Sequence, residues 1–147
     1  NSRLIHTARL INDDVPYKIA AKIRRALRDT SNPRIVALGV TYKPDTHDIR
    51  NSPALKIIDL LREDGYHVEA YDPIADGYQY SSIREVAEGA DCLAVLVEHQ
   101  SIKEELTQEE AEIKQTMHHP LILRFYQDEV KSRLEIRKTT SIVGSVG

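Results

Sequence analysis

The sequence lacks several features on which common functions depend. Tryptophan is absent and aromatic residues make up only 5% of the 147 residues, which argues against a stacking platform for single-stranded nucleic acid. A net charge of −3 provides no broad positive field for nucleic acid or an anionic membrane. No apolar run approaches the roughly 18 residues of a membrane span, and no signal peptide is visible. We therefore predict no nucleic-acid and no membrane partner.

Groups that carry chemistry are also scarce. The single cysteine, Cys92, cannot form an internal disulfide, which fits the reducing cytoplasm, and it opens an apolar run in which a thiol is usually inert. The pair His118-His119 lacks the i, i+4 or cysteine-rich spacing of a metal site. A G-x-G-x-x-G fingerprint is missing as well. We therefore predict a cytoplasmic chain with no metal site, no catalytic residue and no principal dinucleotide site of its own.

What the sequence does contain is an alternation of strand and helix patterns. Short apolar runs typical of buried strands are followed by segments with helical spacing. The strands are predicted at 35–40, 67–71, 92–97 and 121–125, and the helices at 53–64, 82–88 and 107–117. This alternation predicts an α/β fold with a doubly wound, Rossmann-like parallel sheet.

The first 32 residues predict a helical connector in front of that sheet. Helical spacing extends over 3–12, and Asp13-Asp14-Val15-Pro16 predicts an interruption, since aspartate can cap a new helix with proline in its first turn. A second helix is predicted over 16–29. We therefore divide the chain into a connector, 1–32, and a sheet domain, 33–147. Because the chain begins with Asn1, we expect it to be a piece of a longer protein.

The loop after the first predicted strand carries the clearest functional signal. It contains the cations Lys43 and Arg50, and Ser52 and Pro53 then begin a helix as its N-cap and first residue. Two cations beside a helix N-terminus suit the binding of phosphate groups.

Doubly wound sheets bind ligands beyond the carboxyl ends of their strands. Those ends are Thr41–Lys43, Asp72, Glu98–His99 and Phe125–Tyr126. We interpret Asp72 as the start of a turn and His99 as a residue with a local structural role.

A resemblance to a known family begins in this loop. Residues 39–53, which read GVTYKPDTHDIRNSP, resemble the signature of the C-terminal domain of nucleotide-sugar 6-dehydrogenases. Further similar segments are Thr7–Asp13, Gly65–Val68, Tyr71–Pro73, Ala90-Asp91 and Glu98-His99. The chain is thus similar to the UDP-glucose/GDP-mannose dehydrogenase family over about residues 4–125, and closest to its branch for UDP-N-acetylmannosamine and UDP-N-acetylglucosamine.

The resemblance implies a function. Enzymes of this family oxidise the C6 alcohol of a nucleotide-sugar to a carboxylate with two NAD⁺, and the product feeds polysaccharide synthesis. They form dimers and combine an N-terminal Rossmann domain that binds NAD, a central helical domain and a UDP-sugar-binding domain. The implied partners are therefore the UDP-sugar, the two missing domains and a second subunit, with residues 1–32 as the tail of the central domain. Since the catalytic cysteine segment of the family has no match here, the chain alone should be inactive.

The resemblance also implies roles for single residues. Tyr42 and Lys43 match a pair that contacts the nucleotide-sugar, and an ammonium group suits pyrophosphate or sugar oxygens. Arg50 matches an arginine that reaches the cofactor from another domain. The alternative for Arg50 is an ion pair with Asp45 or Asp48 that shapes the loop, and both roles can hold together. We interpret the two aspartates as organising the loop.

One segment departs from the family pattern. Relatives carry Asp-Gly-Arg after the fourth strand, whereas this chain has Arg124-Phe125-Tyr126, and no site role is assigned to these residues. This departure and the missing thiol favour the alternative function, a non-catalytic nucleotide-binding or interaction module with the same fold. The reading frame upstream of Asn1 would distinguish the two functions.

Overall fold

Four strands alternate with helices along the chain, as the sequence predicts. The computed structural model describes the backbone of residues 2–125 and the side chains of residues 14–125. The elements are α1 (Ser2–Ala26), β1 (Arg34–Leu38), α2 (Pro53–Glu63), β2 (His67–Tyr71), α3 (Ile83–Ala87), β3 (Cys92–Val95), α4 (Gln100–Thr116) and β4 (Leu121–Arg124). All strand pairs are parallel, in the order β2-β1-β3-β4.

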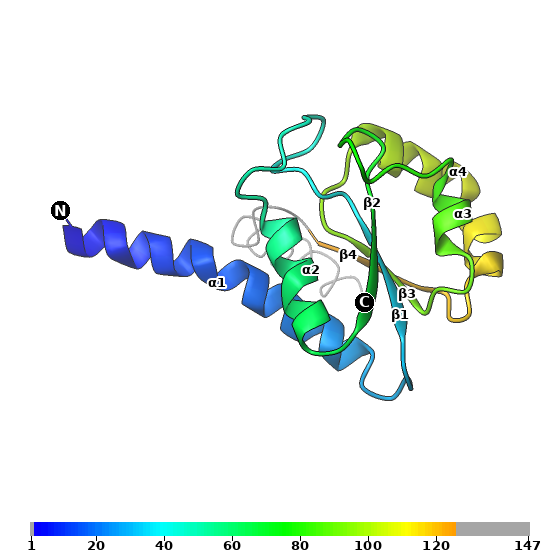
Figure 1. Ribbon diagram of the computed structural model, residues 1–147, viewed down its shortest axis with the longest axis horizontal. Coiled ribbons are helices and arrows are strands. Elements are labelled where there is room, and N and C mark those ends of the chain that lie inside the picture. Colours follow the sequence, from blue (N-terminus) through cyan, green and yellow to red (C-terminus); the bar gives the residue numbers. More distant parts are fainter. Residues whose placement is uncertain (1, 126–147) are drawn as a thin grey trace, which may run out of the picture.

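Helices cover both faces of this sheet. In Figure 1, α1 and α2 lie on one face and α3 and α4 on the other. The predicted doubly wound α/β fold is therefore confirmed. Among the described residues, no helix combines the length and the apolar character needed to cross a bilayer.

The two inner strands supply both halves of the core because their side chains alternate between the faces. In β1, Ile35 and Ala37 join the cluster under α1 and α2, whereas Val36 and Leu38 join the cluster under α3 and α4. The same alternation in β3 places Cys92 in the first cluster. Cys92 is fully buried, and this burial, with the nearby Asp91 carboxylate, raises the pKa of its thiol to about 12. The prediction that Cys92 is inert packing is thus confirmed.

The predicted interruption at Asp13–Pro16 is wrong, because α1 runs through Pro16 as one helix. Proline removes one hydrogen bond from a helix interior, but its φ angle is itself helical, so the chain can continue at that cost. Beyond Pro16, Ile19 and Ile23 lie on the side of the helix that faces the sheet, and both are buried. The helix predicted after Pro16 is thus present, and what the local pattern does not reveal is its continuity with the helix before Pro16.

The predicted helix 107–117 is too short, since α4 begins at Gln100. Only Ile102, Leu106 and Ile113 are buried in this 17-residue helix, so its apolar pattern is weak. The helix is also kinked at Glu109, whose φ of −122° and ψ of 23° are not helical. The prediction therefore missed the first turns, although Ile102 and Leu106 are buried there.

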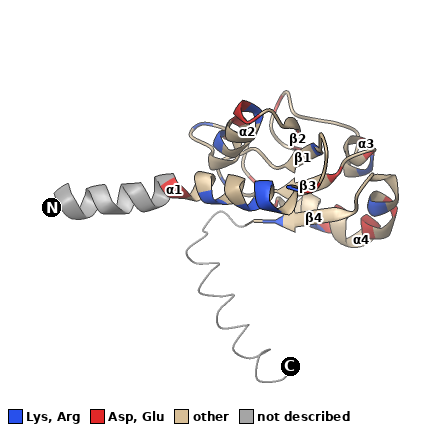
Figure 2. Cartoon of the chain, turned by 90° about the horizontal axis from the view of Figure 1, so that it is seen from below, with Lys and Arg blue, Asp and Glu red and all other residues tan. Residues whose placement is uncertain are grey.

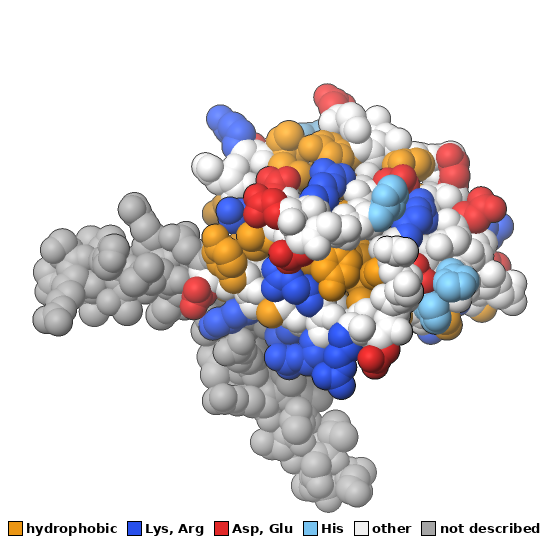
Figure 3. Space-filling model, turned by 60° about the horizontal axis from the view of Figure 1, so that its bottom comes forward, with side chains coloured by type: hydrophobic (Ala, Val, Ile, Leu, Met, Phe, Trp, Pro, Cys, Tyr) orange, Lys and Arg blue, Asp and Glu red, His pale blue; other side chains and the backbone are white. Residues whose placement is uncertain are grey.

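Charged side chains lie mostly on the helices and loops. Figure 2 shows basic residues along the described part of α1, whereas the strands carry few charged residues. Acidic groups lie among the basic ones on the face displayed in Figure 3. Arg24 of α1, for example, forms an ion pair with Asp64 at the end of α2. This pair and the shared apolar cluster join α1 to the sheet domain, and the division at residue 32 stays a prediction.

Candidate functional site

The candidate site lies where the order of the strands reverses. From β1 the chain passes through α2 to β2 on one side, and it then crosses to β3 on the other side of β1. Open α/β sheets form a ligand-binding crevice at such a point, beyond the carboxyl ends of the strands. The loops that follow β1 and β2 and the start of α4 gather at this edge, at the top of Figure 1.

Gly39 allows the loop after β1 to lie directly against the segment after β3. Its φ is +90°, and a Cβ atom on this residue would lie 2.0 Å from the carbonyl oxygen of Val97. Only glycine combines this backbone conformation with so close an approach. The position of the whole loop thus depends on the absence of a side chain at residue 39.

Asp72 is a buried carboxylate that holds three segments together. Its Oδ1 accepts hydrogen bonds from the backbone N–H groups of Ile74 and Ala75, at 2.8 and 2.9 Å, which confirms its predicted role in starting a turn. Its Oδ2 accepts from the N–H of Val40 at 2.8 Å and lies 2.8 Å from Nε2 of His99. Asp72 therefore links the ends of β2, β1 and β3.

His99 continues this chain of hydrogen bonds to the loop. It is fully buried, and its Nδ1 accepts from the backbone N–H of Asp45 at 2.8 Å. Because Nδ1 accepts, we assign the ring proton to Nε2, which then donates to Asp72. Asp45 in turn uses Oδ1 to accept from the N–H of Gln100, at 3.0 Å, at the start of α4. His99 thus has the structural role predicted for it.

Acid should weaken the fold through Asp72. Burial opposes ionisation of this carboxyl, but hydrogen bonds from His99, Val40, Ala75 and Ile74 outweigh burial and lower its pKa from the usual 3.8. Because the pKa is lower in the folded chain, the stabilisation by the carboxylate is complete well above pH 3.8 and is lost as the pH falls through the folded pKa. In urea unfolding at a series of pH values, we expect the free energy of unfolding of the natural chain to fall more steeply below pH 3.8 than that of Asp72→Asn. Parallel pH profiles of the two proteins would contradict this expectation.

Above this buried framework, the exposed part of the loop forms a cleft. The cleft has a volume of about 310 Å³ and is lined by Tyr42, Asp48, Arg50 and Asn51. The N–H of Tyr42 donates to the carbonyl of Asp48 at 2.7 Å, which closes the loop on itself. The ring of Tyr42 is half exposed. The structure thus brings Tyr42 and Arg50, two of the three residues singled out in the sequence, to one cleft.

Arg50 makes the ion pair that the sequence analysis gives as its alternative role. Its Nε and Nη2 donate to the two carboxylate oxygens of Asp48 at 3.0 and 3.1 Å. The hydrogen bond from Arg50 is the main reason why the pKa of Asp48 is lowered. The guanidinium remains 85% exposed, so the pair orients it without removing it from solvent. The predicted role of Asp45 and Asp48 in organising the loop is confirmed.

Lys43 is exposed next to Tyr42 but does not line the cleft. Its carbonyl accepts hydrogen bonds from the hydroxyls of Thr41 and Thr46, at 2.8 and 3.1 Å, so its backbone is fixed. Within the described part of the chain, no hydrogen bond or ion pair engages its ammonium group.

Ser52 occupies the predicted N-cap position of α2, with Pro53 as the first helical residue. Its hydroxyl makes no cap hydrogen bond, however, and donates to the carbonyl of Thr41 at 3.2 Å. The predicted N-cap position is therefore confirmed, and the buried hydroxyl closes the base of the loop instead of bonding to the helix.

Arg124, at the end of β4, reaches the same edge of the sheet. Its Nε lies 3.4 Å from Oε1 of Glu98, at the end of the segment after β3. This ion pair lacks the geometry of a hydrogen bond, and Oε1 of Glu98 is a buried oxygen with no hydrogen-bond partner among the described residues. Tyr126, the last residue of the predicted strand end, lies outside the described residues.

Sequence reasoning missed the link between Asp72 and His99. The signal that could have found it is their shared position, since each follows a strand at the same edge of the sheet.

Residues 36–127 match the family model described as UDP-glucose/GDP-mannose dehydrogenase family, UDP binding domain. Similar curated proteins include the UDP-N-acetyl-D-mannosamine dehydrogenase of Methanococcus vannielii, 33% identical over 127 residues, which span 84% of this chain and 30% of the relative. The enzyme of the same name from Pyrococcus horikoshii is 38% identical over 104 residues, or 68% of this chain and 25% of the relative. The chain thus spans less than a third of the length of these relatives.

Solved structures of dehydrogenases are also similar to this chain. The structure of the UDP-D-ManNAc dehydrogenase from Pyrococcus horikoshii matches with a TM-score of 0.74 and 34% identity, over 84% of this chain and 29% of that one. The UDP-N-acetyl-mannosamine dehydrogenase Cap5O from Staphylococcus aureus also matches with a TM-score of 0.74, at 28% identity, over 88% of this chain and 30% of that one.

Proposed function

The chain belongs to the UDP-glucose/GDP-mannose dehydrogenase family, and on this premise we propose that it binds the UDP-sugar for an NAD-dependent UDP-N-acetylhexosamine 6-dehydrogenase. The observation that carries the proposal is the cleft at the reversal of strand order, since its lining residues all lie within the segment that matches the UDP-binding model. The names of the similar curated proteins support N-acetylmannosamine as the sugar.

In this proposal, Tyr42 and Lys43 contact the UDP-sugar. The side chain of Lys43 is exposed on a backbone that two threonine hydroxyls hold in place, so only the side chain must be ordered when it meets a diphosphate. Tyr42 supplies an exposed ring and a hydroxyl at the mouth of the cleft. The binding energy gained here would orient the C6 alcohol toward reacting groups in another part of the protein.

Arg50 is proposed to meet a phosphate of NAD that another domain holds. Asp48 engages its Nε and Nη2, which leaves the Nη1 edge of the exposed guanidinium for an incoming phosphate. The bound NAD would accept hydride from C6 of the sugar.

The sheet described here does not fit a second, complete dinucleotide site. A dinucleotide-binding fold uses an acidic residue near a strand end for the ribose hydroxyls, but Asp72, at the end of β2, is fully buried and engaged by protein groups. No glycine fingerprint accompanies it in the sequence. The main NAD site is therefore proposed for an N-terminal Rossmann domain.

We further propose the division of the chain into a connector, 1–32, that belongs to a central dimerisation domain, and a UDP-sugar-binding domain, 33–147. The full-length protein would then act as a homodimer, and its uronate product would serve polysaccharide synthesis. These proposals are supported by the greater length of the relatives, because the chain spans only 30% and 25% of the two relatives described above.

Replacing Lys43 with alanine in the full-length protein is expected to weaken UDP-sugar binding by about tenfold or more, because one charge-assisted contact to a diphosphate is lost. Titration calorimetry with UDP-sugar and, separately, with NAD measures the two affinities. Arg50→Ala should have the opposite effect and weaken NAD binding more than UDP-sugar binding.

The matched control is Lys103→Ala, which removes an exposed lysine from α4. This variant should bind both ligands as the natural protein does. Equal losses of UDP-sugar and NAD affinity in the Lys43 variant, or the same loss in the control, would overturn the role given to Lys43.

A further inference from the structure

A second group of side chains lies at the opposite edge of the sheet, at the amino ends of two neighbouring strands. Asp91 directly precedes β3, and His118 and His119 lie between α4 and β4. Since β3 and β4 are parallel, with Cys92 beside Leu121, the residues before the two strands come together. The spacing of the histidine pair along the chain predicts no metal site, because it does not include Asp91, which lies 27 residues before His118.

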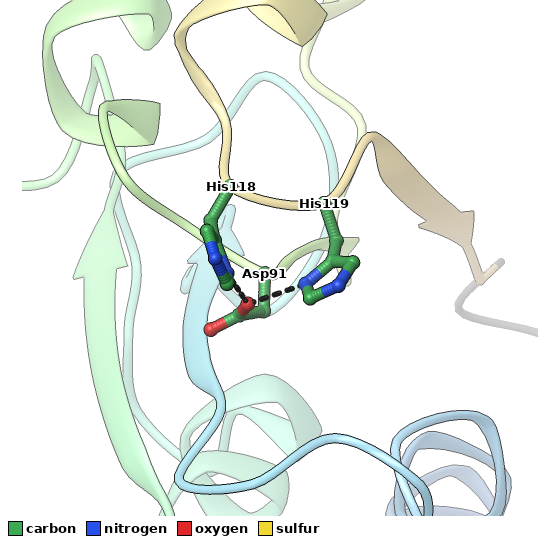
Figure 4. Close-up of side chains that lie close together, drawn as sticks. All are labelled: Asp91, His118 and His119. Carbon is green, nitrogen blue, oxygen red and sulfur yellow. Dashed lines mark hydrogen bonds and ion pairs between the residues drawn. The ribbon is translucent and has the colours of Figure 1, made fainter.

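The three side chains converge on one carboxylate oxygen (Figure 4). Nδ1 of His118 and Nδ1 of His119 each lie 2.7 Å from Oδ1 of Asp91. The two imidazole rings are 4.5 Å apart between their centroids and nearly perpendicular, at 79°. One ligand atom from each residue lies within 4.8 Å of the others.

We propose that Asp91, His118 and His119 form a binding site for a divalent transition-metal ion, with Zn²⁺ as the ion that fits best. Two imidazole nitrogens and a carboxylate oxygen are a donor set that zinc uses in proteins, with a fourth position left for water. The carboxylate of Asp91 also supplies a negative charge that attracts a cation.

The ligands are held in place by backbone contacts. The second oxygen of Asp91, Oδ2, accepts from the N–H of Arg34 at 2.7 Å, which fixes the orientation of the carboxylate. The N–H groups of His118 and His119 both point to the carbonyl of Ala90, at 2.8 and 3.3 Å. Such supporting hydrogen bonds are typical of metal sites, where they orient the ligands before the ion arrives.

The solvent side of the site is open. The side chain of Asp91 is only 8% exposed, whereas those of His118 and His119 are 69% and 52% exposed. Histidine side chains also reach the surface on the face displayed in Figure 3. The ion can therefore enter from solvent, and the imidazoles can move apart to the ligand separation of about 3.3 Å that tetrahedral zinc requires. The bound ion would tie the segment before β4 to the start of β3.

Zn²⁺ binding to the metal-free chain tests the proposal. Calorimetric titration with Zn²⁺ alone should show one ion per chain, and His118→Gln and His119→Gln should each weaken binding by about tenfold or more. Zn²⁺ should also raise the midpoint of thermal unfolding of the natural chain, and the double variant should lose this shift. Both histidines are exposed, so the variants should fold.

His67→Gln is the matched control, because His67 is an exposed histidine at the amino end of β2, the same edge of the sheet. It should bind Zn²⁺ like the natural chain. Absence of binding at about 1 mM Zn²⁺ would overturn the proposal and leave the three side chains as a hydrogen-bonded cluster. Undiminished binding to the double variant would also overturn it, because the ion would then belong to other residues.

Discussion

Replacing Gly39 with alanine is expected to lower the free energy of unfolding by about 2–6 kcal/mol, combining backbone strain with overpacking. The positive φ of +90° disfavours any side chain, and the new Cβ would meet the backbone oxygen of Val97 at 2.0 Å. Gly39 directly follows β1 and Val97 lies two residues beyond β3, so the paired inner strands hold both backbones in place. Urea unfolding followed by circular dichroism measures the loss.

Gly65→Ala is the matched control for this variant. Gly65 has nearly the same φ, +92°, but nothing lies within 4 Å of the position of its Cβ. Its replacement should cost only the conformational strain of about 1–2 kcal/mol. The difference between the two variants therefore isolates the close approach to Val97, and equal losses would show that this approach carries no penalty.

Replacing Asp72 with alanine should have a comparable effect, a loss of about 3–5 kcal/mol in the free energy of unfolding. The change leaves His99 and the N–H groups of Val40, Ile74 and Ala75 buried without their acceptor. Burying such donors unpaired is costly because water cannot replace the lost partner. Urea unfolding at neutral pH measures this loss.

Two further variants separate the causes. Asp72→Asn keeps one carbonyl oxygen for the turn but places an amide NH₂ beside hydrogen-bond donors. Its stability should therefore lie between those of the natural chain and Asp72→Ala. Asp76→Ala removes an exposed acid from the same turn and should leave stability unchanged. If Asp72→Ala were as stable as Asp76→Ala, the network described for Asp72 would contribute nothing to folding.

The order of elements could be predicted from the sequence because each strand is a short apolar run. The strands β1, from Ile35 onward, and β3 are buried, and the sheet order places both at its centre. The boundaries of α1 and α4 could not be predicted in the same way. Pro16 looks like the start of a helix in any local window, and whether the helix continues depends on packing that lies elsewhere in the chain.

In the candidate site, too, local contacts could be predicted and long-range contacts could not. The ion pair between Asp48 and Arg50 spans two residues, so a local pattern suggested it. The contact between Asp72 and His99 spans 27 residues and exists only once the strands pair. The N-cap position of Ser52 followed from the local pattern, whereas its hydrogen bond to the carbonyl of Thr41 appears only in the folded loop.

The short strand β3 connects the proposed metal site with the base of the candidate cleft. Asp91 stands before it and His99 after it, and eight residues of chain span no more than about 30 Å. A paramagnetic or luminescent ion placed at the amino end would therefore lie within the working range of spectroscopic distance measurements to the loop at the other end. A change in that distance would report the arrival of a nucleotide at the loop without attaching a label.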